Sequence, residues 1–529
     1  MFEIESLPKG LFLKKNAPLL TGMMRGVERE ALRTDMNGTM ASTEHPQRLG
    51  SALTHPQITT DFSESLLEFI TPPTHSVDDL FNQLYATHRF TLSQLDNELL
   101  WTSSMPCAIG QDGNIPVARY GSSNIGRMKT VYRVGLGHRY GRAMQAVSGV
   151  HYNFSLPNAF WAFLSQHQNS LSDLQDFKDE GYFNLIRNFR RNYWLLIYVF
   201  GASPALCKSF VSSKNHALQN IDENTLHLPF ATSLRMGDLG YQSSAQESLY
   251  VCYNTKASYV KSLCGAITTP HPAYQEIGIK DDRGLYKQLN TSLLQIENEF
   301  YSSVRPKRTA KSGETALSAL QNRGVEYIEV RCLDVNPFES VGLSREQVYF
   351  LDTFLLYCAL QSSPQTSREE TARILRNQKR VVNNGREPGL QLDDLSGGKI
   401  DLKFWGLGLL AGMRSAAELL DAANQCEHHQ SALELQKEKL LDAGKTPSAR
   451  ILNTLKEGEL SYSDYALDLS KRHCAALVEQ PLDAAIMKRM ADMAEESLAE
   501  QQAIEEQESS DFDSFIVEYY QQYKSCRKI

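Results

Sequence analysis

The chain has 529 residues, of which 42% are hydrophobic and 22% are charged, which is typical of globular proteins with a substantial core. Its net charge of -8 and pI near 6.0 argue against general nucleic-acid binding, which requires a basic surface, but allow a locally basic nucleotide pocket. The nine cysteines include no Cys-x-x-Cys pair. This spacing argues against a zinc site or a dithiol redox motif, and we expect free thiols without a structural disulfide.

Targeting signals are also missing from the sequence. The N-terminus lacks the basic-then-apolar pattern of a signal peptide. The most apolar run, residues 193–202, is far shorter than the roughly 18 residues that a membrane helix needs. These features predict a cytoplasmic enzyme without a membrane partner.

In the first hundred residues, strand and helix patterns alternate. The stretch up to Pro18 is mildly amphipathic and is expected to form a helix on the outside of the fold. Residues 22–32 are typical of a strand that ends in a tight turn at 35–38. Residues 58–70 are expected to start with a short polar strand and to finish with the apolar run 66–70, which Pro72 and Pro73 stop. Residues 77–99 are expected to form a helix with apolar side chains at three- and four-residue steps.

A glycine- and serine-rich loop at residues 119–127 leads into a predicted helix that carries Lys129, Tyr132 and Arg133. Residues 145–155 then alternate in the manner of a strand. One face of that strand is polar enough to bind a ligand, and it holds Val147, Gly149, His151, Asn153 and Ser155.

The middle of the chain is less regular. Residues 222–242 are expected to be loop with a short strand. Further strands are predicted at 294–297 and 324–335, separated by the basic run Arg305-Pro306-Lys307-Arg308.

The last third of the chain is helical in character. Long helical patterns continue from about residue 344 to the end, and they include an acidic stretch at 493–510 that predicts a solvated helix. We find no internal repeat and no long linker. The sequence therefore predicts one catalytic unit over residues 1–529, with a sheet core at 20–343 and a mainly helical portion at 344–529.

Three segments place acidic side chains at the spacing of a strand face. Residues i and i+2 of a strand point the same way, so Glu28 and Glu30 share a face, as do Glu329 and Arg331. The third segment runs from Asp61 to Glu68. Several carboxylates on one sheet face are costly unless cations lie between them, and divalent ions with oxygen ligands are the usual solution.

Taken alone, each segment has a simpler explanation. Glu28 and Glu30 would fit a solvated edge strand bridged by arginines, and His151 would fit a structural role. Together, the apolar flanks of all the segments indicate sheet interiors, where buried carboxylates require counter-charge. An adjacent arginine indicates an anion such as a transferring phosphoryl group. The sequence thus predicts a metal-dependent phosphoryl-transfer enzyme.

Glycine-rich phosphate loops give no competing interpretation. The Gly-Leu-Gly runs at 135–137 and 406–408 begin like a dinucleotide fingerprint, but the third glycine comes one residue late in each. There is no Gly-x-x-x-x-Gly-Lys-Ser/Thr segment, so any use of ATP is not of the P-loop kind.

A series of sequence blocks resembles the proteobacterial glutamate–cysteine ligases. The blocks recur in family order from residue 25 to about residue 340, which is more specific than any single motif. They are RGVERE (25–30), SALTH (51–55), TTDF (59–62), LEFITP (67–72), SGVHYNFS (148–155), FGASP (200–204), ATSLR (231–235), QIENE (295–299), RPKR (305–308) and EYIEVR (326–331).

This resemblance implies an α+β fold like the glutamine synthetase catalytic domain, in which a curved antiparallel sheet forms a funnel surrounded by helices. It also implies a reaction. ATP would drive the joining of the γ-carboxylate of L-glutamate to the amine of L-cysteine through a γ-glutamyl phosphate, the first step of glutathione biosynthesis. Mg²⁺, for which Mn²⁺ can substitute, would be the cofactor, and the partners would be these small molecules alone.

The resemblance also assigns site residues, in four groups. Two or three metal ions would be shared by Glu28, Glu30, Asp61, Glu68, His151 and Glu329. Arg331 would meet the transferred phosphoryl group and act in catalysis with Glu329. The amino-acid pocket would contain Tyr132, Arg235, Tyr241 and Tyr301. Contacts with phosphate or with a substrate carboxylate would come from Lys129, Arg133, Arg305, Lys307 and Arg308.

Three other functions keep the same carboxylates. A related ligase could join glutamate to a different amine. A two-metal phosphohydrolase also needs clustered carboxylates and histidine. A binding protein could have kept the sheet without the chemistry.

Overall fold

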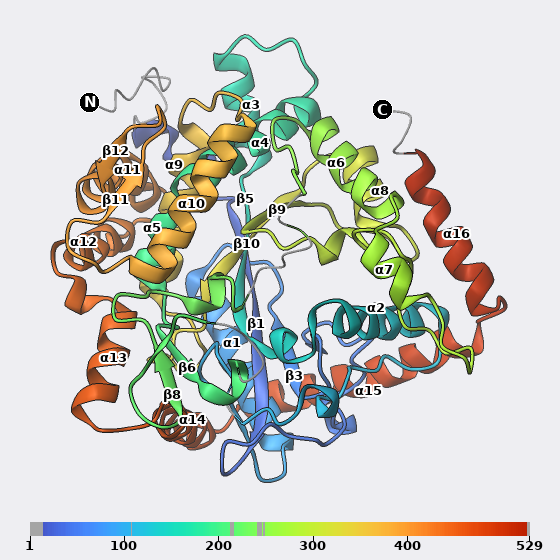
Figure 1. Ribbon diagram of the computed structural model, residues 1–529. Helices are drawn as coiled ribbons and strands as arrows, with labels where there is room; N and C mark the ends of the chain where they lie inside the picture. The colour runs from blue at the N-terminus through green and yellow to red at the C-terminus, as the bar shows by residue number, and fades with distance from the viewer. Residues whose placement is uncertain (1–13, 107, 212–215, 241–245, 247–248, 526–529) are drawn as a thin grey trace.

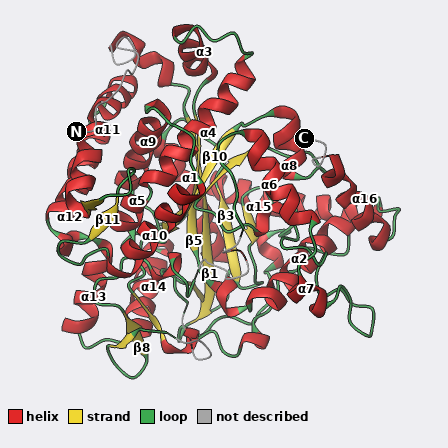
Figure 2. Cartoon of the chain, turned by 45° about the horizontal axis from the view of Figure 1, so that its top comes forward, coloured by secondary structure: helices red, strands yellow, loops and turns green. Residues whose placement is uncertain are grey.

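A computed structural model describes residues 14–106, 108–211, 216–240, 246 and 249–525 (Figure 1). An antiparallel sheet lies at the centre and helices surround it, as the view coloured by secondary structure also shows (Figure 2). The strands follow the order β2-β3-β1-β5-β10-β9, with β4 paired to the far end of β1. Their bounds are β1 Met24–Asp35, β2 Ile58–Thr60, β3 Leu66–Ile70, β4 Glu98–Leu100, β5 Gly149–Ser155, β9 Val304–Lys307 and β10 Tyr327–Asp334.

Two smaller sheets lie outside the central one. Their strands are β6 Ala205–Cys207, β7 Gln219–Asn220, β8 Thr225–His227, β11 Gln391–Asp393 and β12 Lys399–Asp401. The helices before residue 344 are α1 Val77–Gln94, α2 Asn124–Tyr140, α3 Asn158–His167, α4 Leu174–Asn192, α5 Trp194–Phe200, α6 Lys256–Thr268, α7 Pro272–Ile277 and α8 Ala316–Arg323. The later helices are α9 Arg345–Leu360, α10 Arg368–Asn384, α11 Leu402–Asn424, α12 His428–Leu441, α13 Pro447–Glu457, α14 Tyr462–Val478, α15 Ala484–Glu506 and α16 Phe512–Ser525.

Strand β1 organises the sheet. It pairs with β3 on one side and β5 on the other, so it is central and its side chains are buried or half-buried on both faces. On the face away from the acidic side chains, Val27 and Ala31 join the core. The buried arginines Arg25, Arg29 and Arg33 alternate with them on that same face.

Most of the strongly patterned elements are confirmed. The strands predicted around 22–32, 145–155 and 324–335 are β1, β5 and β10, and the helix that carries Tyr132 is α2. The turn after β1 is closed by a hydrogen bond from the Gly38 amide to the Asp35 carbonyl, at 3.1 Å. Gly38 has a φ of 84°, a conformation that glycine adopts without strain.

The short polar strand and the apolar run expected over 58–70 are β2 and β3, but the strand-face spacing predicted from Asp61 to Glu68 is wrong, because a turn joins the two strands into a hairpin. The Asp61 amide donates to the Leu66 carbonyl, and the Leu66 amide donates back to the Ser63 carbonyl, both at 2.9 Å. The turn places Asp61 at the end of the hairpin. The helix predicted over 77–99 ends earlier, at Gln94, because the chain becomes extended at Leu95 and continues into β4.

The strand prediction at 294–297 is also wrong, since the chain there is loop leading into a short 3₁₀ helix, η8 Glu297–Glu299. The basic run at 305–308, expected to separate two strands, instead lies largely within β9. Because β9 is the edge of the sheet, Pro306 is tolerated there without losing a ladder hydrogen bond. The predicted N-terminal helix lies mostly outside the described residues, which begin with the 3₁₀ helix η1 Lys14–Leu20.

The last third of the chain is helical, as predicted, apart from the β11–β12 hairpin. The acidic helix α15 is only partly solvated. A Cβ atom at Gly50 would lie 2.8 Å from the Ala494 backbone, so this helix packs closely on the N-terminal part of the chain. The division at residue 344 stays a prediction.

Among the described residues, no helix is long and apolar enough to cross a membrane. The seven described cysteines are free thiols, in line with the expectation of no structural disulfide. Cys107 and Cys526 lie outside the described residues.

Candidate active site

The register of the central sheet brings the predicted acidic side chains together on one face. Glu28 of β1 lies opposite His151 of β5, and Glu30 lies opposite Glu68 of β3. Glu329 of β10 lies opposite Asn153 of β5. Four strands that are distant in sequence therefore supply one cluster.

His151 is the centre of this cluster. Its Nδ1 lies 3.1 Å from Oε2 of Glu28 and 4.0 Å from Oε1 of Glu329, and its Nε2 lies 3.6 Å from Oε1 of Glu30. Candidate ligand atoms of His151, Glu28 and Glu68 all lie within 4.8 Å of one another. Imidazole and carboxylate donors at this spacing can share a metal ion.

The carboxylates differ in their electrostatic environment. Burial raises the pKa of Glu68 well above its ordinary value, and repulsion from Glu28 and Asp61 raises it further. Burial likewise raises the pKa of Glu30. Burial also acts to raise the pKa of Glu329, but Lys307 and Arg331 outweigh it and hold that pKa well below the ordinary value. Cations therefore outweigh burial at Glu329, while burial outweighs them at Glu30 and Glu68.

The cations that face Glu329 come from β9 and β10. Arg331 Nη1 lies 3.2 Å from Oε1 of Glu329, and Lys307 Nζ lies 3.4 Å from the same atom. Arg305 is more distant, at 3.9 Å from Oε2, and it donates to the carbonyls of Asn298 and Phe300 at 2.8 and 2.6 Å. Arg305 thus also fixes the loop that precedes β9.

Several buried polar atoms of the cluster have no hydrogen-bond partner. They are Nε2 of His151, Oδ1 of Asn153 and Oε2 of Glu329. Leaving a buried acceptor without a hydrogen bond costs free energy. A divalent cation bound by these oxygen-rich side chains would remove that cost. Mixed carboxylate and imidazole donors suit Mg²⁺ or Mn²⁺ better than softer metals.

A pocket opens beside the cluster and shares residues with it. Glu30, Asp61 and Arg331 form its end nearest the cluster, and aromatic and amide side chains form the rest of the wall. The further lining residues are Phe62, Tyr132, Arg133, Leu136, Met144, Gln145, Val147, Gly240, Asn298, Glu299 and Tyr301. A small polar molecule in this pocket would reach the acidic cluster directly.

Lys129 and Arg133 approach from helix α2. Both cations lie over the ring of Tyr120, at 5.2 and 4.5 Å from its centroid. Arg133 also donates to the Asp61 carbonyl and so braces the β2–β3 turn. Burial, together with the neighbouring Arg133, lowers the pKa of Lys129 to about 8.

Arg235 is buried behind the cluster and is absent from the pocket lining described above. Its Nη1 lies 3.8 Å from Oδ1 of Asp334, and it packs so closely on Gly149 that a Cβ there would be 1.9 Å from Nη2. The Gly149 amide in turn donates to Glu30 at 2.6 Å. The structure therefore places Arg235 against the backbone that supports the cluster, and its predicted grip on a substrate carboxylate stays a prediction.

The remaining predicted residues have different outcomes. Tyr132 and Tyr301 line the pocket as expected. Tyr241 lies outside the described residues. Arg308 is 3.9 Å from the exposed Glu326, and the structure does not bring it to the carboxylates.

Two further parts of the site were missed in the sequence. Asn153 donates to Oε1 of Glu28 at 2.8 Å, and Gln145 donates to the Tyr301 hydroxyl at 2.7 Å. The alternation of β5 placed Asn153 on the polar face but gave it no role. No pattern in the sequence singles out Gln145, because its contact with Tyr301 spans 156 residues.

Comparison with known proteins gives consistent matches. The profile of the family described as glutamate-cysteine ligase matches residues 9–381. Glutamate–cysteine ligases of Saccharophagus degradans and Pseudomonas aeruginosa are 63% and 49% identical, over 99% and 95% of each chain. The crystal structure of glutamate–cysteine ligase from Francisella tularensis in complex with AMP has a TM-score of 0.90 at 38% identity, covering 95% of this chain and 98% of that one. A bifunctional glutathione synthetase from Pasteurella multocida, 24% identical with a TM-score of 0.71 over 90% of this chain and 57% of that one, shares the fold.

Proposed function

Because the chain belongs to the glutamate–cysteine ligase family, we propose that it uses ATP to join the γ-carboxylate of L-glutamate to the amine of L-cysteine. The products are γ-glutamylcysteine, ADP and phosphate, and the reaction is the first step of glutathione biosynthesis. The observation that carries this proposal is that Glu30, Asp61 and Arg331 belong to both the acidic cluster and the pocket. A phosphoryl group and a small amino acid can therefore meet there.

The residues of the cluster fit divalent metal ions. Glu28, Glu30, Asp61, Glu68, His151 and Glu329 are the proposed ligands for Mg²⁺, with Mn²⁺ as a substitute. When bound, these ions would offset the negative charge of the phosphates and of the carboxylate cluster. The raised pKa of Glu68 and the unpaired oxygens of Asn153 and Glu329 support this assignment.

The proposed reaction has two steps. A carboxylate is a poor acyl donor, so its γ-oxygen first attacks the γ-phosphorus of ATP, which releases ADP and forms γ-glutamyl phosphate. The cysteine nitrogen then attacks the γ-carbonyl carbon, the carbon–oxygen bond to phosphate breaks, and the nitrogen loses a proton. Arg331 is placed to stabilise the charge on the transferred phosphoryl group, and Lys307 adds a second positive charge beside Glu329.

The protein contributes mainly by positioning the reactants. Three negatively charged groups, the ATP phosphates, the substrate carboxylate and the intermediate, must occupy the same small volume. Lys129 and Arg133 on α2 approach from the side opposite to Lys307 on β9, so cations border the cluster on two sides. Holding charged reactants in a fixed, partly desolvated arrangement can supply several kcal/mol of the barrier reduction, roughly 7–11 in the best cases.

ATP as the nucleotide has support from a relative. The Francisella tularensis ligase, which shares the fold over nearly its whole length, was crystallised in complex with AMP. Among the described residues no P-loop is present, so the phosphates depend on side-chain cations and metal ions. We also propose a cytoplasmic location, where ATP and free thiols are available.

The amine is proposed to be cysteine and not ammonia or serine. Tyr132 and Tyr301 give the pocket aromatic walls that suit the polarizable thiol. Ammonia could use none of these contacts. Serine differs from cysteine only in its hydroxyl, and small pocket differences of this kind give about 1–3 kcal/mol of discrimination.

A coupled assay of phosphate release tests the proposal against its rivals. The ligase is expected to release phosphate from ATP only when glutamate and cysteine are both present, with formation of γ-glutamylcysteine. Release without amino acids would identify a phosphohydrolase. Equal turnover with ammonia would identify a different glutamate–amine ligase, and no release under any condition would indicate a binding protein.

A further inference from the structure

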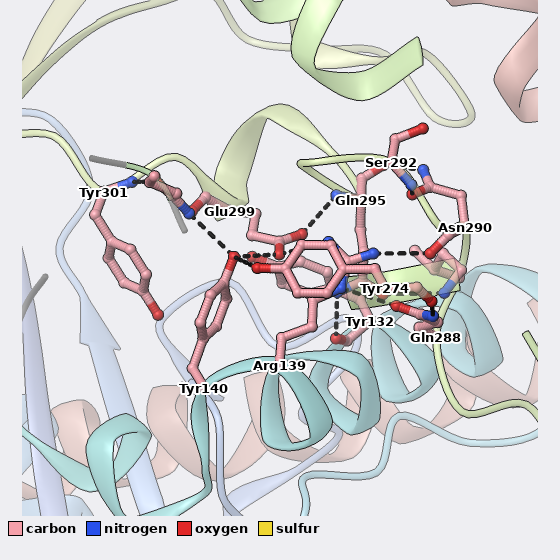
Figure 3. Close-up of polar contacts among 12 residues, drawn as sticks. Tyr132, Arg139, Tyr140, Tyr274, Gln288, Asn290, Ser292, Gln295, Glu299 and Tyr301 are labelled. Carbon is pink, nitrogen blue, oxygen red and sulfur yellow. Dashed lines mark hydrogen bonds and ion pairs between the residues drawn. The ribbon is translucent and has the colours of Figure 1, made fainter. Parts of the chain in front are cut away.

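A buried polar network behind the pocket wall has no assigned role (Figure 3). Its centre is Glu299, which is 1% exposed. Oε1 of Glu299 accepts from Arg139 at 2.8 Å and from the Tyr140 hydroxyl at 2.7 Å. Oε2 accepts from the backbone amide of Gln295 at 2.5 Å. Both oxygens therefore accept hydrogen bonds from within the protein, which fix the orientation of the Glu299 carboxylate.

Arg139 is held as firmly as its partner. It donates to the Gln288 side chain at 2.9 Å and to the Asn290 carbonyl at 2.7 Å, and its guanidinium lies 4.1 Å from the centroid of the Tyr274 ring. Both side chains of the Arg139–Glu299 ion pair have 0% relative exposure. Buried networks in which every member is paired hold their atoms in one arrangement.

This network is tied to the two aromatic walls of the pocket. Gln246 accepts from the Tyr301 amide at 3.1 Å and donates to the Tyr140 hydroxyl at 3.2 Å and to the Glu299 carbonyl at 2.8 Å. The Tyr140 ring also packs edge-on against the Tyr301 ring, with centroids 5.8 Å apart. On the other side, Gln295 donates to the Tyr132 carbonyl at 3.1 Å.

The Tyr140 hydroxyl joins these contacts. It donates to Glu299 and accepts from Gln246. Tyr140 itself is not part of the pocket lining, and neither is Arg139, whereas Glu299 and Tyr301 both line the pocket. We propose that Tyr140 is a positioning residue for the amine substrate, acting through Gln246 and Glu299 on Tyr301. This inference rests on the proposed function and names a determinant of its specificity.

The amine substrate should depend on this wall more than the other substrates do. In the proposed reaction, glutamate would be anchored by its γ-carboxylate at the metal ions that the acidic cluster would hold, and ATP by its phosphates. Cysteine carries no such second anionic group, so its affinity depends on the pocket wall. Loosening Tyr301 should therefore weaken cysteine binding first.

The test compares Tyr140→Phe with wild type in the full chain, with KM and kcat measured for all three substrates. This variant keeps the ring against Tyr301 and removes only the hydroxyl. We expect the KM for cysteine to rise about 10-fold, while kcat and the KM for ATP stay within about 2-fold. Gln246→Met should give the same pattern, and the double variant should be less than additive, because both act through Tyr301.

Tyr274→Phe is the matched control. Its hydroxyl donates to the Tyr140 hydroxyl at 3.5 Å, the longest hydrogen bond made by that hydroxyl, so the KM for cysteine should change much less than in Tyr140→Phe. A uniform loss of kcat with all three KM values unchanged, or no effect of Tyr140→Phe, would overturn the positioning role. If the wild-type protein did not ligate glutamate and cysteine, both the proposed function and this inference would fail. If the wild-type protein did ligate them and Tyr140→Phe had the same kinetic constants, only this inference would be rejected.

Discussion

Two buried clusters of this protein use similar side chains for different purposes. The first is the acidic cluster around His151. The second joins the end of α11 to the start of α12, where Asp421, Cys426 and His429 also have ligand-type atoms within 4.8 Å of one another. Residue type alone would assign a metal to both.

The second cluster is neutralised by its own surroundings. Asp421 accepts from the backbone amides of His429 and Gln430, at 2.9 and 3.1 Å, and from Nδ1 of His429 at 2.7 Å. On its far side, Nε2 of His429 lies 3.9 Å from Asp352, which forms a 2.9 Å ion pair with Arg25. Two acids thus face two cations, and Asp421 caps α12.

The acidic cluster is arranged differently. Its nearest lysine and arginine, Lys307 and Arg331, both face Glu329, while the ion pairs recorded for Glu28 and Glu30 are with His151. Burial and repulsion from Glu28 and Asp61 raise the pKa of Glu68 well above its ordinary value. Nε2 of the histidine lacks a hydrogen-bond partner in both clusters, but the acidic cluster alone also has unpaired oxygens, on Asn153 and Glu329. The comparison teaches that the pairing of charges and oxygens, more than the presence of carboxylate and imidazole, distinguishes a site that needs a cation from one that is complete.

The largest effect is expected from Glu329→Gln. The substitution keeps the shape of the side chain and removes a proposed metal ligand that also contacts Arg331 and Lys307. Ligase activity should fall by about 10²–10⁴ while the melting temperature changes little. Steady-state kinetics at saturating Mg²⁺ measures it, and near-wild-type turnover would reject the metal role.

The second cluster should respond in the opposite way. His429→Gln leaves Asp421 and Asp352 without their shared cation, so the free energy of unfolding should fall by about 3–5 kcal/mol. Activity measured well below the melting temperature should be largely kept. Chemical denaturation and the coupled assay together check this, and a variant that is stable but inactive would place His429 in the reaction.

The pH dependence of stability should separate the clusters further. Although burial opposes it, Asp352 and Asp421 raise the pKa of His429 to about 10 in the folded protein, against an ordinary value of 6.5. The contribution of protonated His429 to the free energy of unfolding is therefore complete below pH ~6.5. It is lost as the pH rises toward ~10, by at most about 1.4 kcal/mol per pH unit. The difference between wild type and His429→Gln in denaturation from pH 6 to 10 isolates this contribution. If that difference does not depend on pH, His429 is not the charged group of the cluster.

Magnesium should stabilise the protein through the acidic cluster alone. At about 100 times its dissociation constant, a ligand that binds only the folded state adds about 2.7 kcal/mol to the free energy of unfolding. We expect an increase of this order in wild type, a smaller one in Glu329→Gln, and an undiminished one in Cys426→Ser. Thermal unfolding with and without Mg²⁺ measures these differences. Loss of the increase in Cys426→Ser would reassign metal binding to the second cluster.

Local periodicity explains how much of the acidic cluster the sequence predicts. The two-residue repeat of a strand is a property of a few neighbouring residues, so it correctly paired Glu28 with Glu30 and Glu329 with Arg331. The same spacing also singled out the segment from Asp61 to Glu68, but the β2–β3 hairpin that positions Asp61 was missed. A hairpin within a polar run depends on hydrogen bonds such as that of Asp61 to Leu66, which no composition rule reveals.

The second cluster and the network around Glu299 were not predicted, because they depend on pairs distant in the sequence. Arg25 and Asp352 are 327 residues apart, and Arg139 and Glu299 are 160 apart. Each residue alone is ordinary for its helix, strand or loop. Such pairs become visible only when the register and packing of the elements are known.

The smallest expected effect comes from the basic run at 305–308, whose secondary structure was misassigned. The resemblance gave Arg305, Lys307 and Arg308 the same role, and the run was expected to separate two strands. In β9, alternate residues share a face, so Arg305 and Lys307 both point to Glu329 while Arg308 follows the strand and faces Glu326.

This difference gives a matched pair of variants. Lys307→Met removes a cation 3.4 Å from Glu329 and should reduce kcat by roughly 10-fold or more, with a weaker response to Mg²⁺. Arg308→Ala removes a cation whose recorded partner is the exposed Glu326, and exposed ion pairs contribute only about 0–1 kcal/mol, so kcat and all three KM values should stay within about 2-fold. Equal losses in the two variants would mean that the whole basic run contacts phosphate, as the sequence alone suggested. Unequal losses in the stated direction would show that the strand alternation of β9 selects which of these charges reaches the acidic cluster.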